Sequence, residues 1–268
     1  ADIMIRLWIV FFCVLQTSIV FAHDTFFPHF IANPLEARVG SFYQPNADRL
    51  RLDIGQTIDL SEYDLGSGWK AGLGADAFIL TRLRSEGNFK FPVETADYFF
   101  GLQGSAHGMI QSLPIGVRLR LSHISTHLVD GSADAQGVFS SRKPFVYSRE
   151  FADVSGYAML GLIRVYGGLT WIWSTQPRNV GRIVPQLGFD IRHPIGDEFT
   201  FESGYDVRVS EVADITLPTH SVQCGIKYAL MHGKGFWFGL VASTGRSIHG
   251  MYHTEREEYL GYGFRIAY

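Results

Sequence analysis

The chain ends with the stretch Leu260-Gly261-Tyr262-Gly263-Phe264-Arg265-Ile266-Ala267-Tyr268, which decides the fold class. Bulky apolar side chains stand at every second position, with small residues or an arginine between them. Successive side chains of a β-strand point to opposite faces, so this period of two predicts a strand with one apolar face. Residues 199–210 and 220–230 repeat the pattern. The chain is therefore expected to consist of many strands of this kind.

Two architectures bury one face of many such strands. A soluble sandwich turns the apolar face inward, whereas an outer-membrane barrel turns it outward to lipid. Here the strands often exceed ten residues, which suits a tilted span, and aromatic residues gather at strand ends, as at Trp171 and Trp173, like interfacial girdles. The terminal Tyr268 resembles the signal by which the barrel-assembly machinery recognises its clients. We predict an all-β fold, a single antiparallel transmembrane β-barrel, with that machinery as a partner.

We expect about twelve strands, with ten or fourteen as alternatives. Connections after even-numbered strands are mostly short and those after odd-numbered strands mostly long, as at 128–147 and 211–218. Short periplasmic turns and long outer loops are typical of these barrels, so both termini are predicted to be periplasmic. The expected strands are 36–44, 49–60, 68–82, 94–105, 114–127, 148–160, 163–174, 183–193, 198–210, 219–231, 235–246 and 258–268.

The composition excludes several classes of protein. Charged residues make up 18% and aromatic residues 14% of the 268, which excludes a disordered chain. The net charge of −3 and the lack of a basic patch argue against nucleic-acid binding. The mean hydropathy of +0.06 is too low for a helical membrane protein. With only Cys13 and Cys224, the chain has no disulfide framework.

Residues 1–22 are expected to be a secretory signal peptide. Arg6 supplies the positive charge, residues 7–14 the apolar core, and Ala22 the small residue before cleavage. Met4 is the expected start, so that the first three residues precede it artificially. A membrane anchor is the alternative, but the apolar run is short for one. We then expect a periplasmic lead-in over residues 23–35 and the outer-membrane barrel over residues 36–268.

The face of the strands opposite the apolar one carries charges of both signs. In a barrel of this size such side chains leave little internal space once they pair, so we expect a polar, mostly filled lumen. These charges either satisfy one another structurally or serve conduction or binding. They are Lys70, Asp76, Arg118, Arg120, Asp190, Arg192, Glu202, Asp206, Arg208, Lys227 and Arg265.

The fifth expected strand ends with a cluster of polar residues. By alternation, His123, Ser125 and His127 follow the lipid-facing row at the outer end. Residues two apart on a strand lie about 6.8 Å apart at Cα, so either histidine could activate Ser125 as a nucleophile. The alternative is that these residues mark where the strand leaves the hydrocarbon. A metal site is a third option, although His123 and His127 lie about 13.6 Å apart at Cα.

An acid would be needed to orient the histidine, and the sequence leaves three candidates open. These are Asp130, Glu150 and Asp97. A bulge near His123 would reverse the alternation and move the cluster into the lumen.

Much of the chain resembles a family of Gram-negative outer-membrane barrels of unknown function, over residues 27–268. The family pattern at the central segment, His-x-Ser-Ser-His-x-Gly-Asp-Glu, is met here except at Thr126, Val129 and Gly131. The resemblance implies the barrel fold and the outer-membrane location. The matching pieces are Ile31-Ala32-Asn33-Pro34, Thr95-Ala96-Asp97-Tyr98, His123 to Asp130, Ser148-Arg149-Glu150, Arg164-Val165-Tyr166-Gly167-Gly168 and Glu258-Tyr259-Leu260-Gly261-Tyr262-Gly263.

A remoter similarity is to lipid A deacylases of the PagL type, whose barrels carry His-x-Ser on a lipid-facing strand. His123-Ile124-Ser125 matches that motif, whereas Gly137 stands at the spacing of the family's acid. The similarity implies a lipid ester hydrolase at the outer leaflet, with outer-membrane lipids as partners. No cofactor is expected, although calcium is conceivable. The rival hypothesis is a non-enzymatic barrel: a narrow channel, a solute binder or a scaffold for a cell-envelope partner.

The hydrolase hypothesis gives each residue of the cluster a role. Ser125 is the expected nucleophile and His123 the general base, with His127 and Asp130 assisting or orienting. Asp97, Arg149 and Glu150 are the expected substrate-binding residues. The oligomeric state does not follow from the sequence.

Overall fold

The structure is a computed structural model that describes residues 25–134, 136–139, 142–230 and 235–267. The expected signal peptide and the Tyr268 signal lie outside these residues. Within them, no helix is long and apolar enough to cross a membrane.

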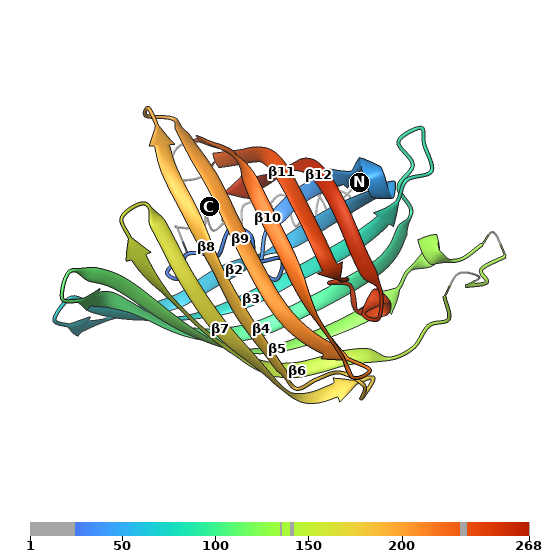
Figure 1. Cartoon of the computed structure of the whole chain (residues 1–268), viewed down its shortest axis with the longest axis horizontal. Helices are drawn as coiled ribbons and strands as arrows, with labels where there is room; N and C mark the ends of the chain where they lie inside the picture. The colour runs from blue at the N-terminus through green and yellow to red at the C-terminus, as the bar shows by residue number, and fades with distance from the viewer. Residues whose placement is uncertain (1–24, 135, 140–141, 231–234, 268) are drawn as a thin grey trace, which may run out of the picture.

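Twelve antiparallel strands close into a barrel, in which each strand pairs with its neighbours in chain order and β1 pairs with β12 (Figure 1). The predicted fold class and strand number are confirmed. The strands are β1 Val39–Gln44, β2 Arg49–Gly66, β3 Trp69–Arg84, β4 Val93–Ile110, β5 Leu113–Leu128, β6 Tyr147–Leu160, β7 Ile163–Gln176, β8 Ile183–Ile195, β9 Phe199–Val212, β10 Ile215–Ala229, β11 Gly235–Arg246 and β12 Arg256–Ala267.

One of the connections expected to be long differs from the prediction. The loop expected over residues 211–218 is a two-residue turn, because β9 continues to Val212 and β10 begins at Ile215. Ala213 and Asp214 both have positive φ, 51° and 63°. Two left-handed residues in succession give a turn whose twist matches that of the flanking strands. The alternation at residues 215–218 is weak, so the sequence pattern missed this end of the hairpin.

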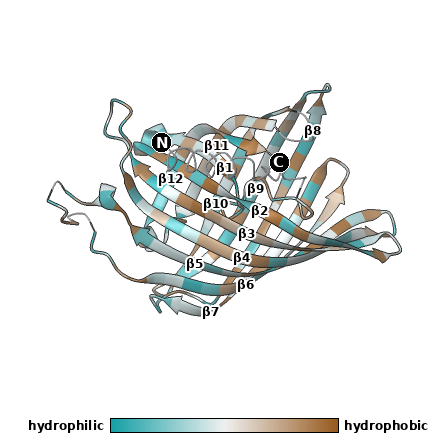
Figure 2. Ribbon diagram, turned by 180° about the vertical axis from the view of Figure 1, so that it is seen from behind, coloured by the Kyte–Doolittle hydropathy of each residue, from teal (hydrophilic) through white to brown (hydrophobic). Residues whose placement is uncertain are grey.

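Hydrophobic and hydrophilic residues alternate along the strands (Figure 2), and the apolar side chains face outward, as the alternation predicts. On β5, Leu119 and Leu121 point outward and are about half exposed, while Arg118 and Arg120 between them are buried in the lumen. A barrel with an outward apolar band is stable only in a lipid bilayer, because that surface would otherwise face water. The protein is an outer-membrane β-barrel.

Residues 25–38, termed the lumen segment below, run inside the barrel, including most of the expected lead-in. Phe30 stacks on Tyr166 of β7 with ring centroids 3.8 Å apart. The Ile31 amide donates to Asp190 Oδ1 at 3.1 Å. A Cβ on Gly204 would lie 3.0 Å from Ile31 Cβ, so this glycine allows the segment to approach the barrel wall. The barrel itself starts at Val39, three residues later than expected.

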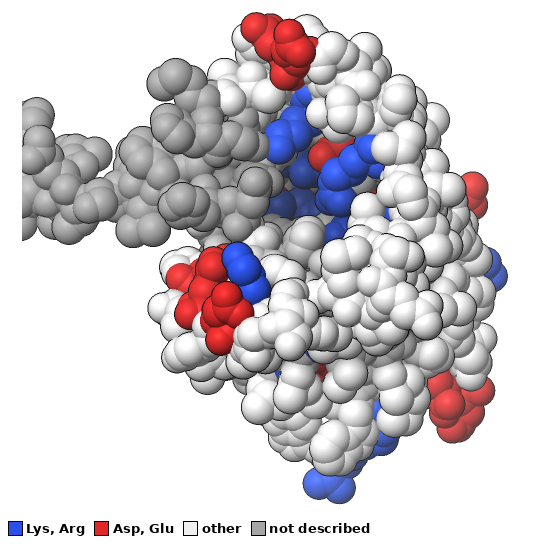
Figure 3. Space-filling view, turned by 90° about the vertical axis from the view of Figure 1, so that its left-hand side faces the viewer, with Lys and Arg blue, Asp and Glu red and all other residues white. Residues whose placement is uncertain are grey.

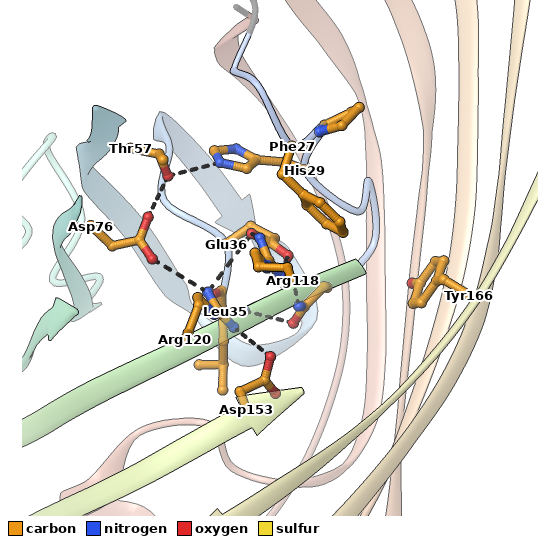
Figure 4. Close-up of polar contacts among 12 residues, drawn as sticks. Phe27, His29, Leu35, Glu36, Thr57, Asp76, Arg118, Arg120, Asp153 and Tyr166 are labelled. Atoms are coloured by element: carbon orange, nitrogen blue, oxygen red, sulfur yellow. Dashed lines mark hydrogen bonds and ion pairs between the residues drawn. The ribbon is translucent and has the colours of Figure 1, made fainter. Parts of the chain in front are cut away.

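An ion-pair network ties the lumen segment to the barrel (Figure 4). Arg118 forms a two-pronged contact with the Glu36 carboxylate, at 3.0 and 2.7 Å. Arg120 donates to the Leu35 carbonyl at 3.2 Å and lies 3.8 Å from Asp76 and 3.5 Å from Asp153. Charges removed from water are tolerated when they are paired in this way. As expected, the lumen is polar and contains paired charges. Part of it is filled by the lumen segment, whose charged side chain Glu36 pairs with the barrel wall.

Candidate functional site

The C-terminal end of β5 carries the polar cluster, and the strand keeps its alternation through it. Ser122, Ile124 and Thr126 are buried on the lumen side, whereas His123, Ser125 and His127 point to the outer wall. The pairing of β5 with β4 and with β6 runs without a register shift. No bulge therefore moves the cluster inward, and it lies on the face expected from the sequence.

The neighbouring strand β6 brings a carboxylate to this cluster. Glu150 stands directly opposite His123, and Ser148 stands opposite Ser125. His123 Nδ1 lies 3.0 Å from Glu150 Oε1. The Ser148 hydroxyl donates to the same carboxylate oxygen at 3.2 Å. The side chains of His123 and Glu150 are 42% and 31% exposed, so the pair is reachable from outside the barrel.

Strands β4 and β7 complete the surroundings of the cluster. Tyr98 lies opposite Ser125, and its ring contacts the His127 ring edge-on at 5.7 Å between centroids. On the other side, Ser174 lies opposite Glu150. The β6–β7 register shifts directly after Glu150, which leaves Trp173 as an extra residue on β7. Bulges of this kind are common next to functional sites, where they redirect side chains.

The polar cluster borders an apolar surface. Phe100, Leu121 and Val154 all point outward and are each about half exposed. Phe100 stands directly opposite His123, and Leu121 precedes it by two residues on the same face. A lipid lying against this wall would thus have its acyl chains beside the apolar band and its polar part beside the cluster.

These groups are those needed for nucleophilic chemistry. A carboxylate that accepts the Nδ1 proton of a histidine fixes the ring tautomer and leaves Nε2 able to take a proton from a serine. Ser125 lies two residues from His123 on the same face, about 6.8 Å away at Cα. Among the described residues no hydrogen bond joins the two side chains. Such contacts are often long in unliganded enzymes and shorten when substrate binds.

The other residues expected at the site lie elsewhere. Asp97 is fully buried on the lumen side, where it accepts from Thr126 Oγ1 at 2.5 Å and from His249 Nδ1 at 2.6 Å. Arg149 also faces the lumen, with its guanidinium 4.8 Å from the centre of the Tyr147 ring. Asp130 lies beyond the end of β5 and accepts from the Gly131 amide at 3.0 Å.

Asp97 anchors the loop between β11 and β12 behind the cluster. The Gly250 amide donates to Asp97 Oδ1 at 2.8 Å, so the 3-10 turn Gly250–Tyr252 rests against the lumen side of β4 and β5. A Cβ on Gly250 would lie 2.3 Å from Thr126 Oγ1, so only glycine permits this approach. This loop therefore supports, from the lumen side, the ends of β4 and β5 beside which Ser125 lies.

The described residues contain no group of three or more His, Cys, Asp or Glu side chains that could hold a metal ion. His123 is engaged by Glu150, and His127 lies against Tyr98. The sequence reasoning did not include Ser148, Ser174 or Tyr98 in the cluster. The only signal for Ser148 was its place two residues before Glu150, on the same face of the same strand.

Comparison with known proteins identifies the family. The model described as "Protein of unknown function (DUF1207)" matches residues 50–268, and the chain belongs to this family. No curated protein matches the sequence.

Solved structures share the fold at low sequence identity. The outer membrane phospholipase of Salmonella typhi, a dimer with bound calcium, matches with a TM-score of 0.56 and 13% identity over 92% of this chain and 94% of that chain. Outer membrane phospholipase A from Escherichia coli gives the same values. The translocator domain of the autotransporter NalP from Neisseria meningitidis gives 0.43 and 11%, over 85% and 84%. The likeness to the two phospholipase structures confirms the outer-membrane barrel fold.

Proposed function

We propose that this DUF1207 protein hydrolyses an ester bond of an outer-membrane lipid at the membrane surface. The observation that carries the proposal is the contact of 3.0 Å between His123 Nδ1 and Glu150 Oε1, on the outer wall that also presents Ser125. Glu150 takes the orienting role for which the sequence left three acids open. The apolar band beside the cluster supports a lipid substrate, and the solved barrels of similar fold include a phospholipase.

The reaction follows from the roles of the three residues. Ser125 Oγ attacks the ester carbonyl carbon while its proton passes to His123 Nε2, and Glu150 stabilises the imidazolium. The C–O bond of the ester then breaks, and the leaving alcohol takes the proton from His123. Water, deprotonated by His123, attacks the carbonyl carbon of the acyl–Ser125 ester. The bond to Ser125 Oγ breaks, Oγ regains the proton from His123, and the fatty acid leaves. His127, whose ring lies against Tyr98, is positioned to contact the lipid head group.

The test compares the outer-membrane lipids of cells that express the wild type, Ser125→Ala or Ser122→Ala. Ser122 is the matched control because it lies on the same strand but faces the lumen, where its hydroxyl has no hydrogen-bond partner among the described residues. Mass spectrometry should show lipids that have lost an acyl chain with the wild type and Ser122→Ala, and not with Ser125→Ala.

Intact lipids in wild-type cells would overturn the proposal, as would equal hydrolysis by Ser125→Ala. A gel-mobility shift on heating checks that each variant forms a closed barrel. If the proposal were overturned in this way, the remaining hypothesis would be the non-enzymatic barrel.

A further inference from the structure

A second feature, unrelated to the outer wall, is a small cavity in the lumen. It has a volume of about 110 Å³. The lumen segment, the strands β5 to β11 and the loop between β11 and β12 form its walls. It therefore lies at the barrel end that carries the long connections β5–β6 and β11–β12.

Basic side chains lie at both ends of the lumen, but their pairing differs. Figure 3 looks onto the opposite end, which carries the short turns, and shows basic side chains gathered in a hollow. Among the arginines that line the cavity there, Arg164 pairs with Asp190. Arg192 and Arg265 both pair with Glu202. Each of these three arginines thus has a carboxylate partner within the protein.

Two arginines of the small cavity lack such a partner. The Arg149 guanidinium lies 4.8 Å from the centre of the Tyr147 ring. Arg246 donates to the carbonyls of Ile215 and His253, at 2.8 and 3.2 Å. Among the described residues no carboxylate lies within ion-pair distance of either arginine, and the Nε of each is buried without a hydrogen-bond partner. The two guanidinium groups are close enough to repel each other.

The third arginine of the cavity is balanced. Arg208 lies 4.0 Å from Asp153, and its charge also acts on Asp206, the carboxylate of the described lining. These two acids account for Arg208. The charges of Arg149 and Arg246 therefore remain without a counter-charge in the lining.

A histidine in the β11–β12 loop adjoins the same charges. His253 lines the cavity and is buried. Its Nδ1 donates to the Gly250 carbonyl at 2.9 Å, and its Nε2 is buried without a partner in the described part of the chain. Burial is the largest effect on the pKa of this ring, and with the charges of Arg149, Arg246 and Arg142 it outweighs the hydrogen bond and lowers that pKa. The cavity thus has a positive potential.

The same cavity has an apolar wall, which one loop residue and strands β5 to β9 supply. The side chains of this wall are Ile124, Phe151, Ile172, Val184, Val212 and Ile248. A ligand in the cavity therefore meets two cations and a hydrocarbon surface together. Its complement is a molecule with one anionic group and an aliphatic body.

We propose that the cavity binds a small aliphatic monocarboxylate of about four carbons, held by Arg149 and Arg246. Guanidinium groups bind carboxylate oxygens through pairs of parallel N–H groups. An apolar cavity of about 150 Å³ holds a molecule of the size of benzene, so the volume of about 110 Å³ suits a slightly smaller body. A second anionic group is disfavoured, because it would lie against the hydrocarbon wall. The site is independent of the proposed hydrolysis.

The binding test uses butyrate as the probe, with butyramide and acetate for comparison. The full chain is purified in an uncharged detergent and titrated in low-salt, carboxylate-free buffer. Saturation-transfer NMR follows the binding, with micelles that lack the protein as the blank. Butyramide, which has the shape of butyrate without its charge, should bind at least tenfold more weakly. Acetate, which lacks two methylene groups, should also bind at least tenfold more weakly.

These three ligands can each contradict the proposal. Failure of butyrate to bind would overturn it. Butyramide binding as tightly as butyrate would exclude the arginines as the recognition element. Acetate binding as tightly as butyrate would overturn the assignment to an aliphatic carboxylate.

Variants decide whether the cavity is the site. Arg149→Gln and Arg246→Gln should each weaken the binding of butyrate at least tenfold. Arg178→Gln, which removes an exposed arginine of the β7–β8 connection outside the cavity lining, is the matched control and should bind like the wild type. Wild-type affinity in both Arg149→Gln and Arg246→Gln would overturn the proposal. Gel mobility checks that each barrel is closed, and Arg149→Gln decides if the loss of the carbonyl contacts of Arg246 prevents folding.

Discussion

The two faces of β5 hold their polar side chains in opposite ways. On the lumen face, Arg118 and Arg120 are buried. Arg118 is held by both oxygens of Glu36, and Arg120 by the Leu35 carbonyl and three carboxylates. On the outer face, His123 is 42% exposed and has one carboxylate partner, and Ser125 stands beside it. A buried charge must be fully paired, because desolvation otherwise costs several kcal/mol. Half-exposed groups at the lipid boundary are free of that demand and can exchange partners, as chemistry requires.

The largest expected effect tests the outer face. Glu150→Gln removes the charge that stabilises the His123 imidazolium, so lipid hydrolysis should fall by about 10⁴-fold, as it does when a triad carboxylate is neutralised. The thermal midpoint of the barrel should hardly change, since the pair is half exposed. The rate is measured with the purified protein and a fluorescent phospholipid.

The control for this variant is Glu62→Gln, which neutralises an exposed carboxylate on β2. It should hydrolyse the lipid at the wild-type rate. If Glu150→Gln also kept the wild-type rate, Glu150 would have no part in orienting His123.

The next effect tests the lumen face. Arg118→Met leaves the Glu36 carboxylate buried without its closest partner, so the free energy of unfolding should fall by about 4 kcal/mol. Urea titration in detergent, followed by gel mobility, measures this change. The double variant Glu36→Gln with Arg118→Met should recover part of the loss, because it leaves no unpaired charge. If the losses in the free energy of unfolding caused by Glu36→Gln and by Arg118→Met simply added in the double variant, the pair would not hold the lumen segment.

A third prediction concerns pH and the lumen segment. Burial, the largest effect on His29, lowers its pKa from 6.5 to about 4. Between these two values the unfolded chain binds the proton and the folded chain does not, so stability rises with pH across this window. As the pH falls from 6.5 to 4, the free energy of unfolding should drop by at most about 3 kcal/mol from His29.

Glu36 adds to this loss only at lower pH. Burial alone would raise the pKa of its carboxyl, but Arg118 and Arg120 more than offset burial and hold the pKa well below its usual range. Its contribution is therefore present above the ordinary glutamate pKa and is lost only under strong acid. The variant His29→Gln should flatten the stability curve between pH 6.5 and 4. An unchanged slope in that variant would assign the pH dependence to other groups.

The smallest effect distinguishes the residues within the outer cluster. Ser148→Ala removes one hydrogen bond to Glu150, worth about 1 kcal/mol at an exposed position, so the hydrolysis rate should fall less than tenfold. A loss as large as that of Ser125→Ala would instead make Ser148 the nucleophile, since it stands opposite Ser125 on the neighbouring strand.

The alternation of side chains was sufficient to predict the strands and their faces. It predicted twelve strands and placed His123, Ser125 and His127 outside, because a period of two depends only on local geometry. The alternation could not decide which of the three candidate acids contacts His123. Glu150 lies 27 residues from His123, across a long loop, and only the register of β6 on β5 sets the two side by side. Asp97 lies on the other neighbouring strand, β4, but faces the lumen, where it binds His249.

The lumen segment had no pattern from which to predict its place. Its residues do not alternate, and its partners are distant in the sequence. Arg118 lies 82 residues from Glu36, and Asp190 lies 159 residues from Ile31. The sequence by itself determined a barrel with an apolar outer wall and a polar lumen, since the alternation of side chains is written along each strand. Only the tertiary structure decided what fills that lumen and which carboxylate meets His123. Both depend on contacts between distant parts of the chain, which form once closure of the barrel fixes the register of every strand.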